Sequence, residues 1–122
     1  MEELICRPDE GREYFTEGRC FILESWNDPR DAHVSIARAR VEPGVTTRRH
    51  RLSGVTERHL ILVGRGRVEI GDLPPGDVLP GDVAVIPPRV RQRITNSGRD
   101  DRLFFCVCIP RFVPEAYEDT DN

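Results

Sequence analysis

The chain has 122 residues, of which 38% are hydrophobic and 32% are charged. This length predicts one compact domain and leaves no room for a second. The net charge of −3 argues against a nucleic-acid partner. All 18 basic residues are arginine, so mechanisms that need a Schiff-base lysine are excluded.

Four cysteines stand at positions 6, 20, 106 and 108, and they form no CxxC pair. Cys106 and Cys108 are two residues apart and would share one face of a strand, a spacing that does not suit an ordinary disulfide. No signal peptide and no apolar stretch of membrane length is visible. We therefore predict a reduced, cytoplasmic protein without a membrane partner.

Short apolar runs separated by glycine and proline predict an all-β domain. After a charged, weakly patterned start, strands are expected at residues 20–25, 33–41, 45–52, 56–63, 67–70, 77–79, 83–86, 90–95 and 103–109. Residues 56–63 and 67–70 are expected to form a hairpin, and a helical turn is expected at 114–118. The regular spacing favours a sandwich or barrel of antiparallel strands.

Residues 44–64 resemble the first of the two motifs of the cupin superfamily. That motif is a glycine, five residues, a histidine, one residue, a second histidine, three or four residues, a glutamate, six residues and a glycine. The chain has Gly44, His50, Glu57 and Gly64 in register, with Leu52 in place of the second histidine.

Residues 81–96 resemble the second cupin motif, with Gly81, Pro87 and Asn96 in register. Arg89 stands where a glycine is expected and Gln92 where a histidine is expected. The resemblance implies one cupin domain over residues 1–122, folded as an all-β double-stranded β-helix or jelly-roll barrel. The chain also resembles small single-domain cupins of the mannose-6-phosphate-isomerase-like neighbourhood, a label that does not establish an activity.

The resemblance further implies a metal site inside the barrel, where the family uses three histidines and one glutamate. Carried over by position, the ligands are His50, Glu57 and Gln92, with Leu52 in the fourth place. Since an aliphatic side chain is no ligand and an amide oxygen is a weak one, a divalent ion (Zn, Mn, Fe or Ni) is expected to bind weakly. It would keep an open coordination position. The alternative is a vestigial pocket in which these side chains hydrogen-bond one another and water.

Two further residues share faces with the motif residues. His59 follows Glu57 by two residues and therefore points the same way. It is open to three interpretations: a replacement ligand, a substrate contact or general acid and base, and an ordinary interior histidine. Arg48 shares the face of His50, either as a clamp for an anionic substrate or in a salt bridge at the barrel mouth. Glu57 and His59 are thus the candidate catalytic residues, and Arg48 and His59 the candidate substrate-binding residues. His33 lies outside the motifs and is a weaker candidate.

These residues leave three functions open. The first is a metal-assisted enzyme of the isomerase, epimerase or lyase type, acting on a small polar or anionic substrate such as a sugar or a carboxylate. The second is a non-catalytic ligand-binding or sensing module. The third is a metal-dependent dioxygenase, which the single histidine at the motif positions does not favour.

The strand expected at 103–109 is apolar on both faces. One face carries Cys106 and Cys108, either as small packing residues or as a thiolate ligand or nucleophile. One face would fill the barrel, and the outer one, either Leu103, Phe105, Val107 and Ile109 or the opposite set, needs a cover. We predict that a second copy supplies it in a homodimer. The alternative cover is the chain's own ends, which offer Leu4, Ile5, Phe112, Val113 and Tyr117.

Overall fold

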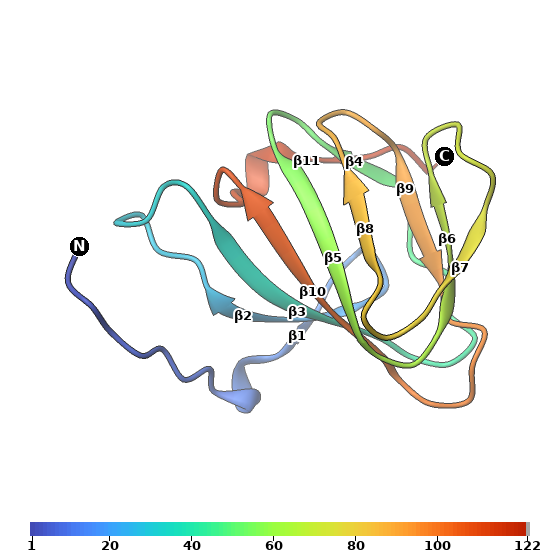
Figure 1. Ribbon diagram of the computed structural model, residues 1–122, viewed down its shortest axis with the longest axis horizontal. Helices are drawn as coiled ribbons and strands as arrows, with labels where there is room; N and C mark the ends of the chain where they lie inside the picture. The colour runs from blue at the N-terminus through green and yellow to red at the C-terminus, as the bar shows by residue number, and fades with distance from the viewer. Residues whose placement is uncertain (122) are drawn as a thin grey trace.

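The protein is described by a computed structural model that covers residues 1–121, and its regular structure consists almost entirely of short strands (Figure 1). The strands are β1 (Tyr14–Phe15), β2 (Phe21–Trp26), β3 (Ser35–Val41), β4 (His50–Leu52), β5 (Thr56–Val63), β6 (Gly66–Ile70), β7 (Gly76–Val78), β8 (Val83–Ile86), β9 (Gln92–Thr95), β10 (Arg102–Ile109) and β11 (Tyr117–Asp119). Two 3₁₀ helices, η1 (Glu10–Arg12) and η2 (Pro114–Ala116), have one turn each. No helix within residues 1–121 has the length and apolar character that crossing a membrane requires.

The strands form two antiparallel sheets that face each other. One sheet has the order β1-β2-β3-β10-β5-β8 and the other the order β11-β4-β9-β6-β7. Figure 1 shows the two sheets opposed in the barrel, with β1, β2 and β3 extending past its left side. This arrangement is the all-β double-stranded β-helix that the sequence predicts.

The expected hairpin of residues 56–63 and 67–70 is wrong. Strand β5 pairs with β10 and β8, whereas β6 pairs with β7 and β9 in the opposite sheet. The turn at 64–66 therefore carries the chain from one sheet to the other. Gly64 makes this possible with a backbone φ of +80°, a conformation that favours glycine.

Other elements differ from expectation in their bounds. The long strand expected at 45–52 is reduced to β4 and an isolated bridge between Thr46 and Thr95, and the Thr47 hydroxyl accepts the Ile94 N–H at 2.9 Å beside that bridge. His33 lies in an exposed turn, so the strand expected at 33–41 begins only at Ser35. The helical turn expected at 114–118 is η2 followed by β11, which pairs with β4.

Two apolar clusters fill the barrel. The first contains Ala39, Val41, Ile61, Ile94 and Phe104. The second contains Leu52, Val55, Cys108 and Ala116, with Phe112, Val113 and Tyr117 packed against it. The apolar residues near the C-terminus thus close one end of the barrel. Glu57 and His59 lie on β5 between Val55 of the second cluster and Ile61 of the first.

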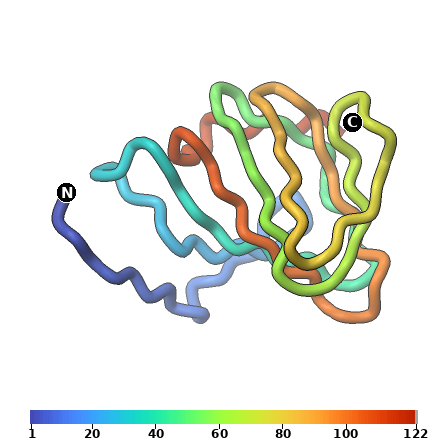
Figure 2. Tube along the Cα trace, viewed as in Figure 1, coloured from blue at the N-terminus to red at the C-terminus, as the bar shows by residue number. Residues whose placement is uncertain are grey.

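Three segments meet at this closed end. Figure 2 shows the β4–β5 and β8–β9 loops at the top of the barrel together with the C-terminal segment. Hydrogen bonds join them: the Arg89 N–H donates to the Leu52 carbonyl at 2.8 Å, and the Ser53 N–H donates to the Ala116 carbonyl at 2.9 Å.

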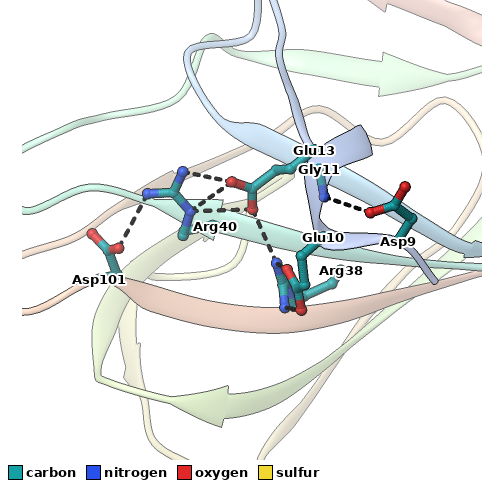
Figure 3. Close-up of polar contacts among 7 residues, drawn as sticks. All are labelled: Asp9, Glu10, Gly11, Glu13, Arg38, Arg40 and Asp101. Carbon is teal, nitrogen blue, oxygen red and sulfur yellow. Dashed lines mark hydrogen bonds and ion pairs between the residues drawn. The ribbon is translucent and has the colours of Figure 1, made fainter. Parts of the chain in front are cut away.

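The segment before β1 is held on the outer side of β3 by ion pairs (Figure 3). Glu13 binds two arginines of β3, Arg40 at 2.6 Å and Arg38 at 3.1 Å. Arg40 also pairs with Asp101 at 3.1 Å and lies over the Phe21 ring, 3.9 Å from its centroid. These contacts lower the pKa of Glu13, chiefly through the hydrogen bond from Arg40.

Substituting Glu13 is therefore expected to destabilise the fold. Glu13→Gln should lower the free energy of unfolding by about 1–2 kcal/mol, since charge-assisted bonds to two arginines are lost. The matched variant Glu10→Gln should have a smaller effect, because the Glu10 side chain is 71% exposed although it also pairs with Arg38.

The pH dependence gives a second measurement of this contact. The folded pKa of Glu13 is below its unfolded value, so its contribution to stability is present above about pH 4.5 and is lost as the pH falls through the lower, folded pKa. Urea unfolding at about pH 7, 5 and 3 should show a smaller acid loss in Glu13→Gln than in the wild type. Equal losses in the two proteins would contradict this assignment.

Candidate functional site

A polar layer lies between the two apolar clusters of the barrel. Glu57 on β5 accepts a hydrogen bond from the Gln92 amide of β9 at 2.5 Å and forms a second contact with His59 Nε2 at 3.0 Å. All three side chains are buried, with exposed fractions of 7% for Glu57, 3% for His59 and 1% for Gln92. The interior of the barrel therefore holds a carboxylate, an imidazole and an amide in direct contact.

The Glu57 carboxyl group stays ionised in this layer. Burial alone raises its pKa, but the adjacent His59 imidazole, His50 and the Gln92 amide outweigh burial and lower the pKa to about 2. A buried, ionised carboxylate is costly to keep unless it is paired or has a function. Glu57 is therefore the chemical centre of the layer.

Cys106 of β10 joins the layer from the neighbouring strand. Residue 106 stands directly opposite His59 in the β5–β10 register. Each of Glu57, His59 and Cys106 has one possible ligand atom that lies within 4.8 Å of those of the other two residues. The group thus combines an oxygen, a nitrogen and a sulfur donor.

The interior cysteines are protonated thiols, which are poor nucleophiles. Burial raises the pKa of Cys106 well above its usual range and that of Cys108 to about 12. Burial also raises the pKa of Cys20. Since the thiolate is the nucleophilic form, the nucleophile alternative is not favoured for these residues.

His50 lies at the edge of the layer. It is opposite Gln92 in the β4–β9 register, only partly buried, and its ring stacks on Tyr117 with centroids 5.0 Å apart. Its Nδ1 contacts the Arg48 carbonyl at 3.0 Å. Because a carbonyl only accepts, Nδ1 carries a proton there.

Arg48 forms the salt bridge that was one of its two predicted roles. Its guanidinium pairs with Asp119 at 2.6 Å and donates to the Asp121 carbonyl. The C-terminal segment thus binds the Arg48 guanidinium, which would otherwise be available to bind an anion.

Part of the lining of the barrel is not fully buried. Several inward-facing residues there are only partly buried, namely Cys20, Ile22, Ala37, His50 and Cys106. A separate cavity of about 440 Å³ lies outside the barrel, against β2 and the N-terminal segment, with Cys6, Asp9 and Trp26 in its lining. Since this cavity contains none of the residues of the polar layer, the candidate site is the barrel interior.

Comparison with known proteins identifies the fold. No protein-family model matches the chain, and no curated protein sequence matches it. Solved structures do match. A protein with a double-stranded β-helix domain from Klebsiella pneumoniae superimposes with a TM-score of 0.71 at 15% identity, over 97% of this chain and 92% of that one. KdgF from Halomonas sp. gives a TM-score of 0.76 at 16% identity, over 89% and 96% of the two chains. The chain has the cupin fold.

A third similar structure is the nucleoside dehydratase Pac13, with a TM-score of 0.76 at 12% identity, over 94% of this chain and 90% of that one. The Streptomyces variants of Pac13 have been solved with uridine. These proteins share the cupin architecture with the chain although their sequences are only 12–16% identical to it. The comparison therefore establishes the fold alone.

The ligand set implied by the cupin resemblance is only partly assembled. Glu57 is central, but Gln92 turns its amide N–H toward Glu57, and its Oε1 has no hydrogen-bond partner within residues 1–121. Leu52 occupies the fourth cupin position and is buried in the second apolar cluster. His50 lies outside the close group of ligand atoms. The residues that do fit a divalent ion are Glu57, His59 and Cys106.

Sequence reasoning missed the place of Cys106 beside Glu57 and His59. The period of two along β10 already indicated that Cys106 shares a face with Phe104. Its position opposite His59 follows only from the register of two strands far apart in sequence. Tyr117, which stacks on His50, was likewise expected only as a possible outer cover.

Proposed function

We propose that this cupin binds a small polar molecule in the barrel interior and acts on it as a metal-assisted enzyme of the isomerase, epimerase or lyase type. The observation that carries the proposal is the ionised, buried Glu57 held by His59 and Gln92. Two proteins of similar fold, a nucleoside dehydratase and oxalate decarboxylase, are named as enzymes that act on small polar molecules, and this supports the choice.

Glu57 and His59 form the fixed centre of the proposed site. Their burial excludes bulk water and holds both side chains in one geometry. A divalent ion bound there would polarise an oxygen of the substrate as a Lewis acid. Gln92 keeps the carboxylate oriented through the bond from its Nε2, and its free Oε1 is available to accept a hydrogen bond from the substrate.

His50 is the proposed proton carrier. It lies at the edge of the layer, and Nε2 is the ring nitrogen left to exchange a proton because Nδ1 is held by the Arg48 carbonyl. Stacking on Tyr117 fixes the plane of the ring. Arg48 therefore acts through His50 and the C-terminal segment, and we propose no direct contact between its guanidinium and the substrate.

Proton NMR in D₂O tests the activity across several classes of small polar compound. Sugar phosphates, uronic acids, nucleosides and small carboxylic acids are incubated with the protein and added Zn²⁺, Mn²⁺, Fe²⁺ or Ni²⁺. Loss of a C–H signal by exchange, or a new product spectrum, is expected for one class. Glu57→Gln should reduce this rate by roughly 10²–10⁴-fold. The matched variant Glu69→Gln, whose carboxylate pairs with Arg93 outside the barrel, should retain the wild-type rate.

The second candidate, a non-catalytic binding or sensing module, is favoured by the saturation of Glu57, since its two oxygens already contact Gln92 and His59. A compound that raises the melting temperature of the protein but undergoes no exchange or conversion would support this function. Turnover that is unchanged in Glu57→Gln would overturn the proposed enzyme.

We also propose a homodimer formed through the outer face of β10. Leu103, Phe105, Val107 and Ile109 point outward from it, and Leu60 of β5 and Val83 of β8 continue the row beside Phe105. Leu60 is 37% and Val83 54% exposed. Phe112, Val113 and Tyr117 pack at the barrel end instead. They therefore do not compete with a second copy for this face.

Light scattering at micromolar concentration tests the dimer. The wild type is expected at twice the monomer mass of 13.9 kDa, because burying each large apolar side chain contributes roughly 1.5–3 kcal/mol. Phe105→Arg should give the monomer mass, whereas Leu73→Arg, at a 65% exposed loop position, should leave the dimer intact. A wild-type mass of 13.9 kDa would refute the dimer.

The free state of all four cysteines supports the predicted cytoplasmic, reducing location.

A further inference from the structure

We propose that the ion bound in the barrel is thiophilic, with Zn²⁺ as the best match, and that Glu57, His59 and Cys106 are its ligands. This inference rests on the proposed function for the presence of an ion. It replaces the ligand set implied by the cupin resemblance with a carboxylate, an imidazole and a thiolate, which forms as the ion displaces the proton of the Cys106 thiol and releases it to solvent. Neither Cys106 nor His59 stands at a ligand position of the two cupin motifs.

Geometry selects these three residues. Their ligand atoms lie within 4.8 Å of one another, which is close to the separation that three ligands of one tetrahedral ion need at bond lengths of about 2.0–2.3 Å. They come from the adjacent strands β5 and β10, where Cys106 stands opposite His59. The three side chains therefore approach one common point from two hydrogen-bonded strands.

The chemistry of the donors selects the ion. Thiolate sulfur and imidazole nitrogen bind zinc and other borderline or soft ions, whereas magnesium, calcium and manganese prefer oxygen ligands. A set with one oxygen, one nitrogen and one sulfur donor matches a catalytic zinc site, in which three protein ligands leave a fourth position open.

A second, independent feature marks the interior as a ligand site. Gln92 is 1% exposed, and its Oε1 has no hydrogen-bond partner within residues 1–121, although its Nε2 is bonded to Glu57. A buried carbonyl oxygen without a partner is costly. Placed beside the Glu57 carboxylate, it can accept a hydrogen bond from a water or substrate group in the fourth position.

Cys108 serves as the internal control. It faces the interior from the same strand, two residues beyond Cys106, but it belongs to the apolar cluster with Leu52, Val55 and Ala116. It is not one of the three residues whose ligand atoms converge. Cys106 and Cys108 therefore differ in the one property on which metal binding depends.

Cobalt substitution tests the site directly. The full-length protein is freed of metal with a chelator and titrated with Co²⁺, which reports a bound thiolate by a sulfur-to-cobalt charge-transfer band in the near ultraviolet. The wild type should bind one equivalent and show this band, and Zn²⁺ should abolish it by competition. Cys106→Ser should lose the band and bind Zn²⁺ at least about tenfold more weakly.

Cys108→Ser should keep the band, and circular dichroism should show that both variants are folded. Cys106→Ala provides a second test if the serine variant does not fold. A band that survives in Cys106→Ser, a band lost only in Cys108→Ser, or a wild type that binds no Co²⁺ would overturn the proposal. If the band appears as expected but no compound undergoes exchange in D₂O, the metal site stands and the proposed enzymatic function fails. Turnover that persists at the full rate after metal removal would overturn the role of the metal and leave the enzymatic function standing.

Discussion

Gly66→Ala is expected to lower the free energy of unfolding by about 3 kcal/mol and the melting temperature by roughly 10–15 °C. A Cβ atom at this position would lie 1.7 Å from Arg102 Nη1 and 2.6 Å from the Thr95 carbonyl oxygen. The arginine side chain is flexible, but the Thr95 carbonyl belongs to the backbone of β9, which pairs with β6. The clash therefore cannot be relieved by a side-chain rotation alone.

The matched control for this prediction is Gly76→Ala. Gly76 lies on β7, beside β6, and a Cβ atom there meets nothing within 4 Å. This variant should change the free energy of unfolding by less than about 0.5 kcal/mol. Urea unfolding of the two variants measures the difference, and equal losses would show that Gly66 is not constrained by its neighbours.

Arg102→Met is expected to stabilise the protein by about 1–3 kcal/mol. Arg102 is 0% exposed, and burial lowers the pKa of its guanidinium to about 10. None of its three side-chain nitrogens has a hydrogen-bond partner within residues 1–121, although the guanidinium carbon lies 5.6 Å from the centroid of the Phe104 ring. Methionine keeps much of the side-chain volume and removes a buried charge that has no ionic partner.

Arg40→Met is the control, because Arg40 is paired with Glu13 and Asp101 and the same change there should destabilise the protein. Combining Arg102→Met with Gly66→Ala should recover part of the loss at Gly66, since the contact with Nη1 disappears and the contact with Thr95 remains. Thermal and urea unfolding measure the stability of the two single arginine variants, of Gly66→Ala and of the double variant, each relative to the wild type. Destabilisation of Arg102→Met by more than about 1 kcal/mol would mean that a bound water or anion pairs with the guanidinium.

The sheet crossing and the proposed metal site occupy different layers of one barrel. Gly66 and Arg102 lie where the chain crosses between the sheets, next to the first apolar cluster. Glu57, His59 and Cys106 lie between that cluster and the closed end. The Phe104 ring lies next to both sites, 5.6 Å from the Arg102 guanidinium carbon and 4.7 Å from the His59 ring, so cobalt binding by the folded Arg102→Met protein measures how far the two layers are coupled.

Residue spacing predicted an all-β fold, and the resemblance to the cupin motifs predicted the barrel. Alternation along each strand placed Glu57 and His59 on one face of β5, and Phe104, Cys106 and Cys108 on one face of β10, because successive side chains of a strand point in opposite directions. The register of the motifs predicted that Glu57 and Gln92 meet inside a barrel, and they form a hydrogen bond. The alternation is a local property that residue spacing alone shows, whereas the meeting of Glu57 and Gln92 was implied by the resemblance to the cupin motifs.

Which strands are neighbours became known only from the three-dimensional structure. The pairing of β6 with β9 instead of β5, and the position of Cys106 opposite His59, depend on contacts between segments that are distant along the chain. The same holds for Asp119, which engages Arg48, and for Tyr117, which stacks on His50. Strand register between distant segments is set by the packing of the whole barrel. The spacing of residues could therefore predict a carboxylate and a histidine in the interior, but not the thiol that lies beside them.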